Sequence, residues 1–208
     1  SDDWLLSQVL ERYQLSFSWV DTSDLDNLAT AMRENTTLVY IETPANPTLK
    51  MADIGALSRL AKDRDLSLVV DNTFTPLILS PLRHGADVVV HSLTKFVNGA
   101  SDVIAGACLG SRALMDQVKG LRTFFGTMSG PWTGWLLMRS LETLKLRMTA
   151  EMKTAGHLAD FLADHPKVQA VYYLGHLREG DPGSALPYLE MAAGLRPDDL
   201  RIASDLRR

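Results

Sequence analysis

The chain has 208 residues, of which 46% are hydrophobic and 22% charged, and its formal net charge is −4 at pH 7. This composition supports a globular domain with a substantial core, and the interspersed charges exclude a nucleic-acid-binding footprint. No apolar run reaches the roughly 20 residues that span a bilayer, and the first residues lack a signal peptide's basic start. Cys108 is the single cysteine, which fits a reducing compartment, and we expect it in the core. We therefore expect a cytoplasmic protein with no membrane partner.

Strand-like and helix-like segments alternate through the first two-thirds of the sequence. We predict helices over residues 7–13, 24–33 and 51–64, and strands over residues 16–20, 38–41, 66–70 and 87–90. Asp21, Thr22 and Ser23 are candidate N-caps of the second helix. The third helix is amphipathic, because Ile54 and Leu57 recur at helical spacing.

The remaining segments complete an α/β pattern. We predict a turn over residues 96–102, a buried strand over 103–109 and a long helix over 135–162. Apolar strands separated by helices indicate a mostly parallel sheet sandwiched by helices. In such sheets ligands bind beyond the carboxyl ends of the strands, which is where Asn46, Asp71 and Lys95 lie.

Three motifs follow three of these strands. Residues 91–95 read HSLTK, in which a lysine amine can condense with an aldehyde and two hydroxyls can hydrogen-bond a phosphate. Pyridoxal 5'-phosphate (PLP) carries both of these groups. Residues 68–73 read LVVDNT and place Asp71 where a carboxylate can pair with the ring nitrogen of PLP. Residues 42–50 read ETPANPTLK.

The order of these motifs resembles the Cys/Met-metabolism PLP-dependent enzymes, which include cystathionine γ-synthase, the cystathionine lyases and methionine γ-lyase. The resemblance covers residues 1–175 and implies part of the large domain of the fold-type I PLP enzymes. It implies that Lys95 is the catalytic residue, which forms a Schiff base with PLP and moves substrate protons. The other cofactor-binding residues it implies are Asn46 near the ring hydroxyl, Asp71 at the ring nitrogen, Thr73 beside the ring, and Ser92 and Thr94 at the phosphate.

These residues also have structural interpretations. Lys95 suits a solvated loop, Asp71 and Asn46 suit turns, and the hydroxyls of Ser92 and Thr94 suit local backbone caps. His91 is interpreted as a structural residue behind the site. The remaining histidines, at positions 84, 157, 165 and 176, lack metal-ligand spacing, so we expect no metal site.

Some features of the family pattern are not found. Phe96 stands where the family usually has tyrosine, and Ala100 where it usually has histidine, and both positions bear on reaction type. The resembling residues do not include the family's ring-stacking tyrosine or its glycine-rich phosphate cradle. They also lack the tyrosine and arginine that a partner subunit contributes, and the C-terminal arginine that binds the substrate carboxylate.

The resemblance divides the chain into three parts. We predict a partial PLP-binding domain over residues 1–134, a long helix and connection over 135–175, and a helical tail over 176–208. Residues 180–199 resemble part of a tetratricopeptide repeat, because small and apolar residues recur there at the spacing of a repeat helix.

The resemblance implies a PLP-dependent lyase or transferase of sulfur amino-acid metabolism. Such an enzyme performs β- or γ-elimination or replacement on cystathionine, methionine, cysteine or an activated homoserine. Family members form dimers and tetramers. Two alternatives stay open: a non-catalytic truncated or chimeric remnant whose repeat-like helical tail binds other proteins, and another fold-type I enzyme such as an aminotransferase.

Overall fold

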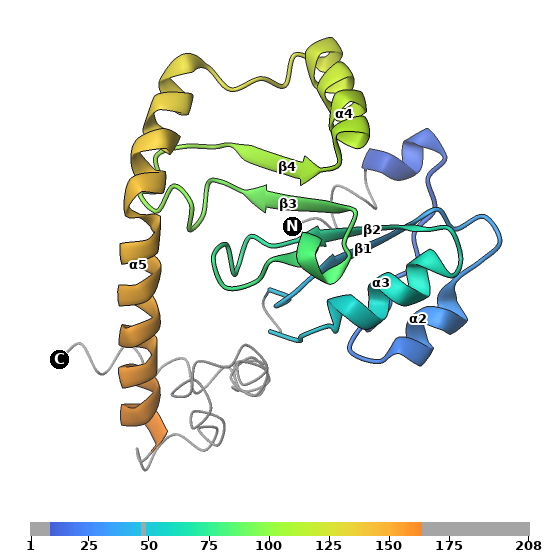
Figure 1. The fold of residues 1–208 in the computed structure, drawn as a ribbon, viewed down its shortest axis with the longest axis horizontal. Coiled ribbons are helices and arrows are strands. Elements are labelled where there is room, and N and C mark those ends of the chain that lie inside the picture. The colour runs from blue at the N-terminus through green and yellow to red at the C-terminus, as the bar shows by residue number, and fades with distance from the viewer. Residues whose placement is uncertain (1–8, 47–48, 164–208) are drawn as a thin grey trace.

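The computed structural model describes residues 9–46 and 49–163, and its helices and strands are labelled in Figure 1. In chain order they are η2 (Leu10–Tyr13), α2 (Leu25–Ala31), β1 (Leu38–Glu42), α3 (Ile54–Lys62), β2 (Ser67–Asp71), η3 (Pro81–His84), β3 (Val88–Ser92), β4 (Gly106–Gly110), α4 (Arg112–Phe125) and α5 (Pro131–Ala163), where η denotes a 3-10 helix. The predicted tail over residues 176–208, with its repeat-like segment 180–199, lies outside the described residues.

The four strands form one sheet in the order β1-β2-β3-β4. Strands β1, β2 and β3 are parallel neighbours, which confirms the mostly parallel sheet. Strand β4 runs antiparallel to β3, because residues 93–105 return to the sheet without the crossover helix that a parallel connection needs. The strand predicted from residue 103 begins instead at Gly106, and Val103 is buried in the loop before it.

One face of the sheet packs against α3, and α2 lies beside α3 (Figure 1). Alternate strand residues point to this face, so that Val39 and Ile41 of β1 are buried with Leu57 of α3. Their neighbours Leu38 and Tyr40 point to the opposite face, where they are 49% and 37% exposed. The two helices therefore cover one face of β1, and in the described part of the chain the other face is accessible.

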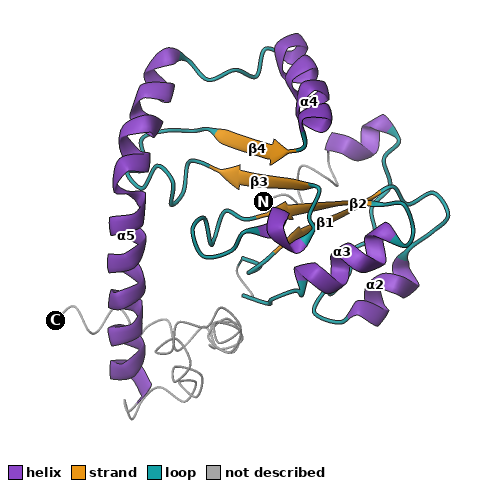
Figure 2. Cartoon of the chain, viewed as in Figure 1, coloured by secondary structure: helices purple, strands orange, loops and turns teal. Residues whose placement is uncertain are grey.

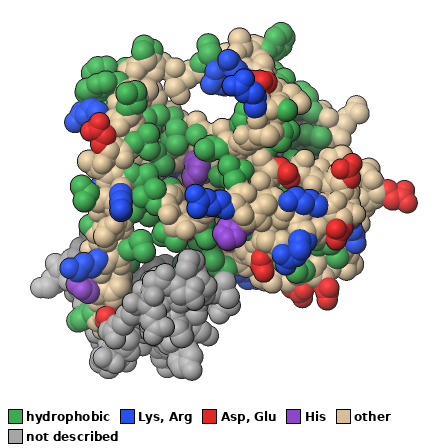
Figure 3. Space-filling model, viewed as in Figure 1, with side chains coloured by type: hydrophobic (Ala, Val, Ile, Leu, Met, Phe, Trp, Pro, Cys, Tyr) green, Lys and Arg blue, Asp and Glu red, His purple; other side chains and the backbone are tan. Residues whose placement is uncertain are grey.

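Helix α5 runs past the edge of the sheet at which β1, β2 and β3 end (Figure 1), and it begins at Pro131 rather than at residue 135 as predicted. Leu144 and Met148 of α5 are buried against Val97 in a second hydrophobic cluster. This cluster attaches α5 to the loop between β3 and β4, which lies beside the helix in Figure 2. In Figure 3, hydrophobic side chains gather between α5 and the sheet, and charged ones are spread over α2 and α3.

Three elements differ from the predictions. Residues 16–20 form no strand, and Trp19 is 60% exposed, because no strand lies next to this segment in the described part of the chain to supply hydrogen bonds. The helix predicted over 7–13 is the 3-10 helix η2, and residues 7 and 8 lie outside the described residues. Helix α4 is not among the predicted elements, although Ser111 caps it by accepting a hydrogen bond from Leu114 N.

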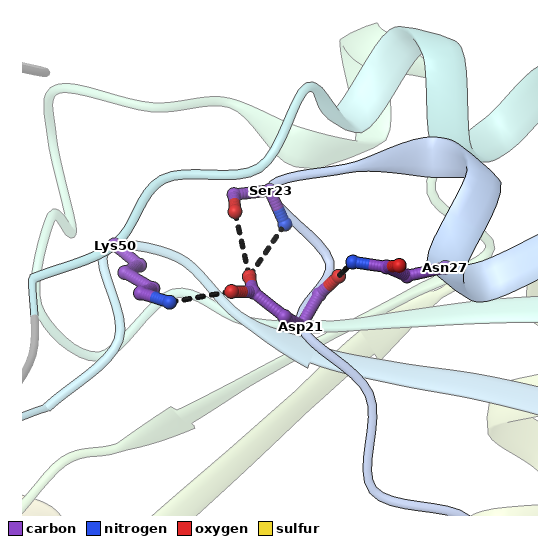
Figure 4. A network of polar contacts seen from close by, with 4 residues as sticks. All are labelled: Asp21, Ser23, Asn27 and Lys50. Carbon is purple, nitrogen blue, oxygen red and sulfur yellow. Dashed lines mark hydrogen bonds and ion pairs between the residues drawn. The ribbon is translucent and has the colours of Figure 1, made fainter.

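The N-cap of α2 is Asp24, which accepts a hydrogen bond from Asp26 N at 2.9 Å. The caps predicted at residues 21–23 were wrong, because Asp21 binds elsewhere (Figure 4). Asp21 forms an ion pair with Lys50 and accepts hydrogen bonds from Ser23 Oγ at 2.6 Å and Ser23 N at 3.1 Å. Hydrogen bonds from Lys50 and Ser23 lower the pKa of Asp21 from 3.8 to about 2. This network ties the chain before α2 to the loop after β1.

Candidate functional site

The three parallel strands end together, which brings their last residues to one edge of the sheet. The register pairs Glu42 with Asp71, and Asp71 with Val90. Since side chains alternate along a strand, Asp71 and Ser92 both point to the face that carries Val90. This is the face opposite α3. Asp71 and Ser92 accordingly line one cavity of about 950 Å3, which β2, β3 and β4 form together with α4.

The half-buried Asp71 carboxylate is fixed by two hydrogen bonds. Its Oδ1 accepts one from Thr73 N at 2.8 Å, and its Oδ2 accepts one from the Tyr40 hydroxyl at 3.3 Å. Each carboxylate oxygen has two acceptor positions, so both retain capacity for a further donor. Asp71 is therefore oriented at the cavity wall and able to accept a hydrogen bond from a protonated ring nitrogen.

The hydroxyls of Ser92 and Thr94, both predicted to bind a phosphate, have different surroundings. Thr73 Oγ1 accepts a hydrogen bond from Ser92 N at 2.7 Å, which joins the ends of β2 and β3. The Ser92 hydroxyl makes no hydrogen bond to another described residue, so a ligand in the cavity can bind it. Thr94 Oγ1 instead accepts from Ala105 N at 3.1 Å and donates to Ala105 O at 3.4 Å. The local backbone cap considered for Thr94 is thus present.

Lys95 lies exposed in the turn that follows β3. Its backbone N donates to Ser92 O at 3.3 Å, and its carbonyl accepts from Gly99 N at 2.8 Å. The side chain makes no hydrogen bond or ion pair with another described residue, and it is not part of the cavity lining. The turn therefore holds the Lys95 backbone beside Ser92, and the exposed amine has no partner among the described residues.

Asn46 lies in the exposed loop after β1. The loop is closed by a hydrogen bond from Ala45 N to Lys50 O at 2.9 Å. No hydrogen bond joins Asn46 to Asp71 or Ser92 in the described part of the chain. The structure thus brings Asp71 and Ser92 together at the cavity, and it leaves Asn46 outside its lining.

Helix α4 adds two basic residues to the cavity wall, Lys119 and Arg122. Positive charge beside a cavity favours an anionic ligand such as a phosphate. Neither residue was predicted as part of the site, because the helix that carries them was not predicted. The amphipathic pattern of residues 112–125 was the signal that could have revealed both.

His91 and Cys108 also line the cavity. Burial lowers the pKa of His91, while the charge of Asp71 and the backbone of Asn72 act in the opposite direction. Cys108, expected in the core, is half-buried at the cavity wall, and burial raises the pKa of its thiol. A thiol with a raised pKa stays protonated at neutral pH, so Cys108 is a poor nucleophile.

Arg147 of α5 is a further residue that was not predicted. Its guanidinium donates hydrogen bonds to the carbonyls of Phe96 and Val97, which directly follow Lys95. The signal in the sequence was weak: Ser140 and Arg147 share one helix face with the apolar residue Leu144, at spacings of four and three residues.

The donor set at this edge of the sheet fits the three polar parts of PLP. The Lys95 amine matches the aldehyde, the Asp71 carboxylate matches a protonated ring nitrogen, and the Ser92 hydroxyl matches the phosphate. The cavity volume of about 950 Å3 also lies in the range of small-molecule sites. These three residues would hold the cofactor.

Two other kinds of feature are absent from residues 9–46 and 49–163. No group of three or more His, Cys, Asp or Glu side chains there is arranged to hold a metal ion. None of the helices in those ranges is both long enough and apolar enough to cross a membrane.

Known proteins similar to this chain are enzymes that act on amino acids. The L-methionine gamma-lyase of Fusobacterium nucleatum subsp. polymorphum is 44% identical over 191 residues, which are 90% of this chain and 48% of that protein. The cystathionine gamma-lyase of Bacillus subtilis (strain 168) is 42% identical over 173 residues, 82% of this chain and 46% of that protein. The chain thus spans about half the length of the curated relatives it matches.

A solved structure agrees with the fold. The crystal structure of cystathionine gamma-lyase from Lactobacillus plantarum complexed with L-serine matches with a TM-score of 0.79 and 34% sequence identity. The match covers 98% of this chain and 49% of that chain. It confirms the fold class predicted from the alternation of strands and helices.

The family profile described as Cys/Met metabolism PLP-dependent enzyme matches residues 2–186. This match confirms the resemblance and PLP as the family's cofactor, and it extends past residue 176, where the tail was predicted to begin. The three similar proteins named above are all described as lyases, and none of them as a non-catalytic protein or an aminotransferase. The chain belongs to the Cys/Met metabolism PLP-dependent enzyme family.

Proposed function

We propose that this chain forms the cofactor-binding part of a PLP-dependent carbon–sulfur lyase or transferase that acts on sulfur-containing amino acids. The observation that carries the proposal is that Asp71 and Ser92 face one cavity, with Lys95 in the turn directly beyond Ser92. The names of the relatives, L-methionine gamma-lyase and cystathionine gamma-lyase, support a sulfur amino acid as substrate. The proposed reactions are β- or γ-elimination or replacement.

Each residue has a distinct task in this proposal. When bound, PLP supplies an electron sink that stabilises negative charge at the α-carbon of an amino acid. The Lys95 amine would hold the aldehyde and carry protons to and from the substrate. Asp71 would keep a proton on the ring nitrogen, and its hydrogen bonds from Thr73 and Tyr40 hold it in the required orientation. Ser92 would donate its hydroxyl to the phosphate.

Three further cofactor-binding residues stay in the proposal with smaller tasks. Thr73 would act by holding Ser92 in place, since its hydroxyl accepts from the Ser92 amide. The hydrogen bond from the Thr94 hydroxyl to Ala105 O is long at 3.4 Å, so this hydroxyl can donate a hydrogen bond to a phosphate instead. Asn46 would approach the ring hydroxyl from the exposed loop after β1.

The division into domains, the cellular location and the association of copies are proposed on separate grounds. We propose a division into residues 1–134, 135–175 and 176–208, and a cytoplasmic location supported by the single cysteine. Association with further copies of the chain is supported by the large apolar side chains that α4 and α5 expose.

PLP titration, trapping with borohydride and peptide mass mapping would test the proposal. We expect a reduced PLP adduct on Lys95, because its amine has no partner among the described residues and lies closest in sequence to Ser92. Lys95→Ala should abolish this adduct.

Two matched variants sharpen the test. Lys119 lines the cavity and is the rival amine, whereas Lys145 lies exposed on α5. Lys119→Ala and Lys145→Ala should both leave the Lys95 adduct intact. A principal adduct on Lys119, or adducts spread evenly over surface lysines, would overturn the proposal.

A further inference from the structure

The Arg147 guanidinium holds the backbone of the turn that contains Lys95. Its Nη1 donates to Phe96 O at 2.7 Å, and its Nη2 donates to Val97 O at 2.9 Å. Both carbonyls belong to the two residues that directly follow Lys95. Charge-assisted bonds of this kind are about twice as strong as neutral ones, so this contact is a firm one.

The same guanidinium is also fixed to its own helix. Arg147 Nε donates to Thr143 Oγ1 at 3.1 Å, and Nη2 donates to Ser140 O at 3.0 Å. Arg147 therefore connects α5 to the turn through one planar group, which makes two hydrogen bonds to the turn and two to its own helix. A lysine ammonium cannot copy this arrangement, because its donors radiate from a single atom.

The residues around Arg147 leave little freedom to the turn. Asn98 is 2% exposed, its Nδ2 donates to Asp102 Oδ1 at 2.9 Å, and its Oδ1 lies 3.5 Å from the Ser140 hydroxyl that donates to it. Gly99 has a φ of +75°, and a Cβ there would fall on Arg147 Nη1 and lie 2.7 Å from Cζ. Only glycine lets the backbone come this close to the guanidinium.

The Lys95 backbone lies inside this arrangement. It donates to Ser92 O on one side and accepts from Gly99 N on the other. Any shift of the segment from Phe96 to Gly99 therefore moves Lys95 relative to Ser92, which lines the cavity. Arg147 itself is not part of the cavity lining, so it can act on a ligand only through the turn.

We propose that Arg147 is a positioning residue: by clamping the turn after Lys95 to α5, it sets where the Lys95 amine meets the aldehyde of PLP. This inference rests on the proposed function, in which Lys95 binds that aldehyde. Misplacing a reacting group by about 1 Å costs up to about 100-fold in rate. Loss of the clamp should therefore slow adduct formation while cofactor affinity, set by Asp71 and Ser92, changes little.

The test compares Arg147→Met, Arg147→Lys and Gly99→Ala with the unaltered 208-residue chain. The rate of borohydride-trapped PLP adduct formation at Lys95 is measured against PLP concentration. We expect all three variants to lower the maximal rate roughly 10- to 100-fold, with the half-saturating PLP concentration changed less than about threefold. Arg139→Met removes an equal charge from the same helix, where Arg139 stacks on Trp135, and should behave as the unaltered chain.

Hydrogen exchange of the Gly99 amide supplies a readout that needs no PLP. It should be faster in Arg147→Met and Arg147→Lys, because both lose hydrogen bonds to the carbonyls of Phe96 and Val97. If Arg147→Met does not fold, Arg147→Lys and Gly99→Ala decide the matter, since the first keeps a side chain of similar length and the second keeps Arg147 itself.

The outcomes separate this inference from the proposed function. An unaltered chain without an adduct at Lys95 overturns the proposed function and this inference with it. An adduct that forms in all three variants at the rate of the unaltered chain overturns this inference alone. Equal losses in rate and affinity would show a merely structural role and would also overturn it.

Discussion

His91 lies at the point where the core of the sheet meets the cavity. It follows Val90 in β3, and its Nδ1 is buried without a hydrogen-bond partner among the described residues. A protonated imidazole needs acceptors for both nitrogens, so this position disfavours the charged form. Burial accordingly lowers the pKa of His91, and the negative charge of Asp71 opposes the effect only in part.

We expect acid to destabilise the fold through His91. Its pKa is 6.5 in the unfolded chain and lower in the fold, so as pH falls below 6.5 the unfolded chain binds the proton first. The contribution of His91 is therefore fully present above pH 6.5 and is lost as pH falls through that value toward the folded pKa. His91→Gln should flatten this decrease, as measured by urea unfolding at about pH 7.5 and about pH 5.5.

The exposed residue His84 provides the control for this prediction. His84→Gln should retain the decrease in the free energy of unfolding between the two pH values. A pH dependence that is the same in His91→Gln as in the unaltered chain would contradict the prediction.

At the site, the role of a residue could be predicted from the sequence only where that residue belongs to a motif. Asp71 and Ser92 were assigned from their motifs, and both line the cavity. Arg147 was not assigned, because its role depends on α5 passing a turn 50 residues earlier in the chain. Such a contact is created by tertiary packing, and no local pattern encodes it.

At the scale of elements, the loop after β1 and the chain before α2 are joined by the Asp21–Lys50 ion pair (Figure 4). Asp21 also accepts two hydrogen bonds from Ser23, so its carboxylate is held in place from the side of α2. Asn46 lies in the same loop as Lys50. The ion pair therefore connects the loop that carries Asn46 to the chain before α2.

We expect a small, salt-sensitive coupling between these two residues. Both side chains are exposed, and exposed ion pairs contribute about 0.2–1 kcal/mol. A double-mutant cycle with Asp21→Asn and Lys50→Met should give a value in this range, decreasing at about 1 M salt. The pKa of Asp21 is lowered from 3.8 to about 2, so the contribution is fully present above pH 3.8 and is lost as pH falls through 2. A coupling unchanged by salt would contradict this account.

Elements were predicted well where burial set their pattern. The apolar runs that form β1, β2 and β3 were found because consecutive residues in each strand are hydrophobic, whichever face they point to. The segment around Trp19 has the composition of a strand but has no neighbour to pair with in the described part of the chain. Strand pairing is non-local, so composition alone could not show that this neighbour is missing.

At the scale of the whole molecule, α4 and α5 leave a broad apolar surface. The large apolar side chains that these helices expose include Phe124, Phe125, Trp132, Met138 and Leu146. Surfaces of this kind are uncommon on monomeric proteins and mark contact sites or aggregation. The chain also spans only about half the length of its relatives.

We therefore expect the chain to associate in solution. Size-exclusion chromatography with light scattering should give a mass above the 22.9 kDa of one chain. Phe124→Glu should reduce association, because a charge would then lie on the apolar surface of α4. Tyr13→Glu places the same charge on η2 and should have no such effect. A stable monomer for the unaltered chain would contradict the prediction.

Because side chains alternate along β2, adjacent residues belong to different faces of the sheet. Leu68 and Val70 pack against α3, while Asp71 lines the cavity on the opposite face. A substitution on one face of β2 leaves the side chains of the other face in place, so the site can change without disturbing the core. Inserting one residue into the strand would exchange the two faces and turn Asp71 into the core. The strand therefore tolerates substitutions better than insertions or deletions.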